Sequence, residues 1–137
     1  MSYIRYSEGY RFQLEADYQH QTALRPAVQG GNRFVRLDAD GLLTIAAGYA
    51  WDGASGPAIN NHTILRGSLV HDACYQLMRL GLVPLDQRDV ADQLLRQTCL
   101  EDGMWPARAW WVYQAVHVFG GRYLAAGGQG NTVLTAP

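Results

Sequence analysis

The segment LVHDACYQL, residues 69–77, places a histidine directly beside an aspartate in otherwise apolar surroundings. A histidine can take a proton from water near neutral pH, and an aspartate can orient that histidine or bind a cation. The segment follows a glycine-rich stretch, GYAWDGASGP, residues 48–57. Turns in such a stretch can present backbone carbonyls to a hard cation such as calcium. These residue types predict a site for general-base chemistry.

A second aspartate, Asp92, is expected to face His71. Residues 63–80 and 87–101 have helical patterns and are joined by the short connection GLVPLD, so the two helices should be antiparallel neighbours. At a rise of about 1.5 Å per residue, counting outward from the connection brings the two side chains to similar heights. An aspartate bonded to one ring nitrogen leaves the other as a base. We therefore predict a catalytic dyad of His71 and Asp92.

The predicted metal ligands are Asp72 and, in the glycine-rich stretch, Asp52. Asp72 points about 100° around the helix from His71. Calcium is the expected ion; zinc is disfavoured because the sequence has no H-x-x-x-H motif and no paired cysteines. Ser55 lacks the G-x-S-x-G surroundings of a nucleophile and is assigned to positioning the substrate.

Structural interpretations of these residues stay open. His71 can be a core histidine bonded to Asp92 for stability alone. Asp92 also has Arg88 and Arg96 one turn away on either side as ion-pair partners. Asp72 can instead clamp the glycine-rich stretch.

The elements that must hold the site change in type along the chain. Residues 10–22 alternate polar and apolar as a strand does, and residues 34–47 have the pattern of a hairpin that ends at Gly48. Helices are expected over 63–80, 87–101 and 107–119, the first of them buried because it is apolar nearly all round. The predicted fold class is therefore α+β, with a small N-terminal antiparallel sheet followed by three helices, the first two an antiparallel pair.

The third predicted helix is rich in aromatic residues. Trp105 and Trp110 are candidates for exposure, where they would mark a contact with a partner or a lipid surface. His117 has no evident carboxylate partner and is expected to be structural. A stripe at helical spacing is expected to face the core: Trp111, Ala115, Val118 and Phe119.

Composition fits a single domain over residues 1–137, comprising a β-rich part at 1–47, a loop at 48–62, a helical part at 63–121 and a tail at 122–137. With 11 basic and 12 acidic residues, nucleic-acid binding is disfavoured. No transmembrane segment or signal peptide is expected. Cys74 and Cys99 should lie too far apart to form a disulfide, and reduced thiols fit a cytoplasmic origin.

Four segments resemble, in the same order, the domain-of-unknown-function 1353 family of phage and bacterial genomes: GYAWDGASGP, LVHDACY, RDVADQLL and WVYQAVHVFGG. This resemblance implies a phage or prophage origin. Such a protein would be made in the host cytoplasm and then join the virion or be released at lysis. The resemblance implies no particular activity.

The sequence HDACY is also similar to the active-site helix of secreted and prokaryotic phospholipase A-two enzymes. This second resemblance implies that His71 activates a water, that Asp72 binds calcium and that Asp92 orients the histidine. Tyr75 matches the tyrosine that follows the pair and is assigned an orienting role. The glycine-rich stretch lies where that family has its calcium loop, although the family's cysteines are missing there.

Different classes of function follow from these observations. The first is a metal-assisted ester hydrolase of phospholipase type, acting on a lipid or cell-envelope substrate. The alternative is a non-catalytic virion, tail or accessory protein, in which the His-Asp cluster is structural and the partners are virion proteins. A cell-wall-degrading or lysis-associated hydrolase would use the same side chains and is a further alternative.

Overall fold

The computed structural model describes residues 4, 6–7, 12–51 and 63–127. Short strands come first and helices follow, which confirms the predicted α+β class. In chain order the elements are β1 (Tyr6–Ser7), β2 (Phe12–Leu14), β3 (Tyr18–Gln21), β4 (Gly30–Gly31), β5 (Val35–Leu37), β6 (Leu42–Ile45), β7 (Ala50–Trp51), α1 (Leu65–Arg79), the 3-10 helix η1 (Leu85–Gln87), α2 (Arg88–Glu101) and α3 (Pro106–Gly127).

The described strands form two small antiparallel sheets, in the orders β1-β2-β7 and β3-β6-β5-β4. The single strand predicted over residues 10–22 is wrong, because this segment divides into β2 and β3, which pair in different sheets. Asp17 lies at the break, where its carboxylate accepts the backbone N–H of Ala47 at 2.8 Å. A side chain that bonds to backbone in this way competes with continued strand pairing.

The predicted hairpin is confirmed as β5 and β6, with Val35 opposite Ile45. Alternate residues of the two strands are buried, as the period of two requires. The expectation that the sheet region ends at Gly48 is wrong, because β7 follows and pairs with β2. Trp51 of β7 also donates its indole N–H to the Ser68 hydroxyl of α1 at 3.0 Å, which ties this sheet to the first helix.

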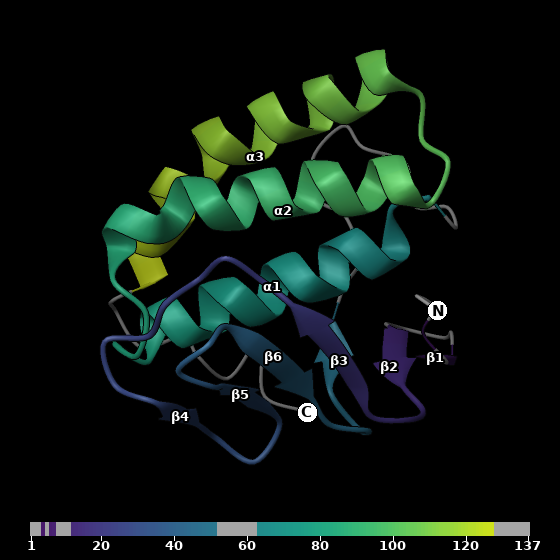
Figure 1. Ribbon diagram of the computed structural model, residues 1–137. Coiled ribbons are helices and arrows are strands. Elements are labelled where there is room, and N and C mark those ends of the chain that lie inside the picture. Colours follow the sequence, from purple (N-terminus) through teal and green to yellow (C-terminus); the bar gives the residue numbers. More distant parts are fainter. Residues whose placement is uncertain (1–3, 5, 8–11, 52–62, 128–137) are drawn as a thin grey trace.

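Helix α1 is the central element of the fold. Figure 1 shows it between the strands and α2, with α3 on the far side of α2. Every residue from Leu65 to Met78 is buried except Asp72, so the prediction of a buried first helix holds. The antiparallel packing of α1 and α2 is close at Gly67. A Cβ atom there would lie 2.9 Å from Leu95 Cδ1 and 3.0 Å from Cys99 Sγ.

Helix α3 differs from its prediction in length and in orientation. It continues through Gly120 and Gly121 to Gly127, because the intervening RYLAA sequence favours a helix strongly enough to offset about 1 kcal/mol per glycine. The first residues of the predicted tail are therefore helical. None of the described helices is long and apolar enough to cross a membrane.

The core face predicted for α3 is wrong for Trp111 and Val118; Ala115 is half-buried, and the side chain of Phe119 lies outside the described part of the structure. Trp111 and Val118 are exposed, whereas Ala109 and Val112 are buried against the α2 side. Both faces of α3 are apolar, so helical spacing alone could not identify the face that packs. The exposure expected for Trp105 and Trp110 is present. Cys74 and Cys99 are buried free thiols, consistent with the expectation of no disulfide.

Candidate functional site

The side chain of Asp92, in the middle of α2, is fully buried and forms the centre of a polar cluster. His71 and Tyr75 reach it from successive turns of α1. His71 Nε2 lies 2.8 Å from Asp92 Oδ1, and the Tyr75 hydroxyl donates to the same oxygen at 2.6 Å. The predicted contact between His71 and Asp92 is therefore present. It exists because α1 and α2 are antiparallel and have polar side chains at matching heights.

Helix α3 contributes a second imidazole. His117 Nδ1 lies 3.1 Å from Asp92 Oδ2 and 3.6 Å from Asp89 Oδ1, so the expectation that His117 lacks a carboxylate partner is wrong. The alternative ion pair with Arg88 is also present, at 3.7 Å from Asp92 Oδ2. Together, His71, Tyr75, Arg88, Asp92 and His117 form what we call the Asp92 cluster, which joins all three α-helices.

The surroundings of Asp92 favour its ionised form. Burial raises the pKa of this carboxyl group, but hydrogen bonds from His71, Tyr75 and His117 lower it by more, so the pKa lies below its ordinary value. An ionised carboxylate only accepts hydrogen bonds, which means that His71 Nε2 and His117 Nδ1 both carry hydrogen. In a neutral His71 ring, the lone pair is therefore on Nδ1.

The His71 ring is held on more than one side. The Tyr75 ring lies one turn further along α1, with its centroid 4.2 Å from that of His71. Burial is also the largest cause of the raised pKa of Tyr75, so the phenol remains a hydrogen-bond donor. Within the described part of the chain, no hydrogen bond engages His71 Nδ1, and the His71 side chain retains 10% exposure. The arrangement can therefore present a basic nitrogen at a site that is almost closed to solvent.

The outer edge of the Asp92 cluster is held by α3. Arg88 donates from Nη1 to the backbone carbonyl of His117 at 2.7 Å. Tyr113 donates a short hydrogen bond to Asp89 and stacks on the His117 ring. The His117 side chain is 39% exposed, so the cluster reaches from the helix interior to the surface.

The structure places only part of the predicted metal site. Asp72 follows His71 on α1 and is partly buried, whereas Asp52 and Ser55 lie outside the described residues. Among the residues that are described, no three His, Cys, Asp or Glu side chains are grouped so as to hold a metal ion. The calcium prediction therefore depends on the glycine-rich stretch.

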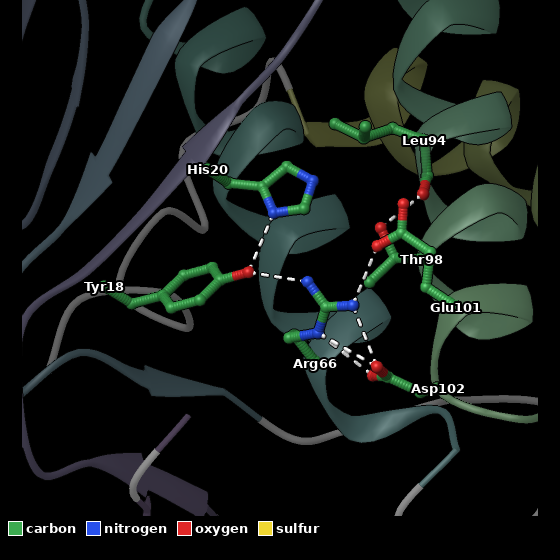
Figure 2. Close-up of polar contacts among 7 residues, drawn as sticks. All are labelled: Tyr18, His20, Arg66, Leu94, Thr98, Glu101 and Asp102. Carbon is green, nitrogen blue, oxygen red and sulfur yellow. Dashed lines mark hydrogen bonds and ion pairs between the residues drawn. The ribbon is translucent and has the colours of Figure 1, made fainter. Parts of the chain in front are cut away.

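A second buried charge, Arg66, lies near the start of α1. Figure 2 shows its guanidinium between Tyr18 of β3 and two acids at the end of α2. Arg66 donates to Asp102 through Nη2 at 2.8 Å and through Nε at 3.0 Å, and to Glu101 at 3.0 Å. Its Nη1 donates to the Tyr18 hydroxyl at 2.8 Å, and that hydroxyl contacts His20 Nδ1. These five residues form what we call the Arg66 cluster.

Sequence reasoning missed the Arg66 cluster although a signal was present. An arginine within a helix predicted to be buried requires carboxylate partners, because an unpaired buried charge costs several kcal/mol. Glu101 and Asp102 end the antiparallel helix and therefore lie beside the start of α1. Burial alone would lower the pKa of Arg66, but hydrogen bonds to Asp102, Tyr18 and Glu101 raise it, so the guanidinium stays charged.

Comparison with known proteins identifies a family but no activity. No curated protein and no solved structure matches the chain significantly. Residues 32–116, more than half of the sequence, match a family described as protein of unknown function (DUF1353). This range contains β5, β6, α1, α2 and most of the Asp92 cluster. The chain therefore belongs to the DUF1353 family.

Proposed function

We propose that this protein is a hydrolase in which His71 acts as a general base on water. The observation that carries the proposal is the contact of His71 Nε2 with the buried carboxylate of Asp92, which leaves the lone pair of a neutral ring on Nδ1. Asp92 fixes the ring orientation and stabilises the imidazolium that forms when the proton is taken. Tyr75 positions the same carboxylate oxygen.

The proposed substrate is an ester, and the similarity of HDACY to phospholipase A-two enzymes favours a lipid ester. Asp72 and Asp52, with backbone carbonyls of the glycine-rich stretch, are the residues that would hold a calcium ion. A bound calcium would stabilise negative charge developing on the ester oxygen. The phage or prophage origin implied by the family resemblance would place the reaction at the cell envelope during entry or lysis.

The proposed base can be removed without removing its hydrogen bond. Glutamine at position 71 places an amide nitrogen close to the position of histidine Nε2, so His71→Gln should keep a donor for Asp92 while deleting the basic nitrogen. We expect hydrolysis of phospholipid vesicles to fall by about 10²–10⁴-fold. His20→Gln, the same exchange in the Arg66 cluster, serves as the matched control.

The assay is run with calcium and with a chelator, and on purified peptidoglycan as well as lipid. Loss of lipid hydrolysis in His71→Gln but not in His20→Gln supports the proposal. Equal activity in both variants would exclude His71 as the base. Activity confined to peptidoglycan would favour the cell-wall alternative. In that case the substrate would be different, but His71 would still be the proposed base.

A non-catalytic role in a virion or accessory protein is the second candidate. The observation that favours it is the position of Asp92, whose partners on α1 and α3 tie the three helices together. In that case the cluster contributes stability alone. Wild-type protein without hydrolytic activity on any of these substrates, together with a large stability loss in Asp92 variants, would support this interpretation.

A further inference from the structure

The outward face of α3 carries large apolar side chains that the described part of the chain leaves exposed. Trp105 is 80% exposed, and Trp110, Trp111 and Val118 are each exposed over about half of their surface. We call these four residues the α3 stripe. Residues 111 and 118 are two turns apart, and residue 110 lies about 100° around the helix from residue 111, so these three side chains lie on the outward side of α3; Trp105 directly precedes the helix.

The opposite side of α3 is already used for packing. Ala109 and Val112 are buried, and Val116 packs against the same small core with residues of α2. The α3 stripe is therefore not a misplaced core face. A row of exposed aromatic and aliphatic side chains of this size marks a contact surface on a folded protein.

Charge along α3 indicates what kind of surface it contacts. Over its 22 residues the helix contains Arg108 and Arg122 but no aspartate or glutamate. An anionic surface is favoured by this balance, because each basic residue near an anionic bilayer contributes about 1 kcal/mol to binding. Tryptophan also suits the headgroup region, where the ring is in an apolar layer while its N–H meets polar groups.

A second copy of the chain fits the stripe less well. The exposed parts of the four side chains amount to an apolar area on the order of 500 Å². Stable protein interfaces bury about 800 Å² on each partner. A bilayer has no such size requirement, since each inserted side chain contributes by itself.

We propose that the α3 stripe docks onto the surface of a lipid bilayer that contains anionic headgroups. The inference goes beyond the hydrolase proposal and does not require it, because no residue of the stripe belongs to the Asp92 cluster. Trp110 and His117 are seven residues apart and so lie on the same flank of α3. Docking would accordingly bring the exposed edge of the Asp92 cluster close to the membrane.

The test is sedimentation of the full chain with large vesicles, made either of phosphatidylcholine alone or of phosphatidylcholine with phosphatidylglycerol. We expect binding at least about tenfold stronger to the anionic vesicles, weakening as salt is added. The double variant Trp110→Gln/Trp111→Gln should lose at least about tenfold in affinity. Leu85→Gln, which removes an exposed apolar side chain from η1, is the matched control and should bind as the wild type does.

Other outcomes would overturn the proposal. These are no vesicle binding, equal binding to both compositions, or equal binding by the double variant. A concentration-dependent dimer that is lost in the double variant, without vesicle binding, would identify a second copy as the occupant. His71→Gln should bind vesicles normally, so failure of the docking proposal and failure of the hydrolase proposal remain distinguishable.

Discussion

The Arg66 cluster and the Asp92 cluster are both built around a buried charge in the α1–α2 pair, but their partners differ. Arg66 faces two carboxylates, and Glu101 keeps 47% of its side chain in solvent. Asp92 is fully buried and is surrounded by two imidazoles, a phenol and a more distant arginine. The Arg66 cluster pairs opposite charges, and its guanidinium keeps its protons. The Asp92 cluster surrounds one carboxylate with hydrogen-bond donors, and a neutral His71 ring keeps a lone pair that can accept a proton, which is what general-base chemistry requires.

The largest difference between the clusters should appear when each central charge is removed. Asp92→Ala leaves the two buried donors, His71 and Tyr75, without their acceptor, so we expect the free energy of unfolding to fall by about 3–5 kcal/mol. Urea unfolding at pH 7 measures this change in the free energy of unfolding. Asp40→Ala, which removes an exposed aspartate in the turn between β5 and β6, is the control. A loss below about 1 kcal/mol for Asp92→Ala would mean that the cluster contributes little to stability.

Removing Arg66 should lower the free energy of unfolding by less than removing Asp92 does. Arg66→Met leaves Glu101 and Asp102 without their cation, but both retain some access to water, so we expect a loss of about 2–3 kcal/mol. Arg36→Met, on the exposed side of β5, is the matched control and should change stability by less than about 0.5 kcal/mol. If Arg66→Met proved more damaging than Asp92→Ala, the comparison between the two clusters would be reversed.

Acidification should affect the Asp92 cluster in a defined direction. The folded-state pKa of Asp92 lies below the ordinary value of 3.8, so its contribution to stability is complete above about pH 4 and is lost as the pH falls through the folded pKa. Asp92→Asn should therefore weaken the decline in unfolding free energy below pH 4. Urea unfolding across pH 2–6, with Asp40→Asn in the turn between β5 and β6 as the control, measures this change. If the free energy of unfolding of Asp92→Asn fell below pH 4 as steeply as that of the wild type, the lowered pKa of Asp92 would be contradicted.

The smallest effect is expected at the exposed edge of the Asp92 cluster. His117→Gln removes a partly exposed donor to Asp92, so a loss of about 1 kcal/mol is expected from urea unfolding. Ring nitrogen NMR should still show hydrogen on His71 Nε2, because Asp92 stays ionised through its remaining partners. A switch of His71 to the other tautomer would show that His117 controls the buried ring.

The sequence predicted those parts of the molecule that depend on local pattern. Alternation and turn residues located the hairpin of β5 and β6, and helical spacing located α1 and α2. The contact of His71 with Asp92 followed from an antiparallel pair with a short connection. Each of these predictions needs only neighbouring elements, whose relative placement a short loop nearly fixes.

The parts that were missed depend on how distant elements pack. The contact of His117 with Asp92 requires α3 to lie along α2 with one particular face inward, and both faces of α3 are apolar. The division of residues 10–22 between two sheets depends on which later strands they pair with. In the Arg66 cluster, Tyr18 comes from a strand far away in sequence, although the pairing of Arg66 with the end of α2 could have been foreseen.

The close approach of α1 and α2 at Gly67 has a consequence for the chemistry one turn later. A methyl group there would lie 2.9 Å from Leu95 Cδ1 and 3.3 Å from the backbone carbonyl oxygen of Leu95, so the absence of a side chain at Gly67 lets α1 and α2 approach closely near His71. Gly67→Ala would accordingly increase the separation of α1 and α2 at this point. It would test how much stretching the imidazole–carboxylate contact tolerates while every polar atom of that contact stays in the protein.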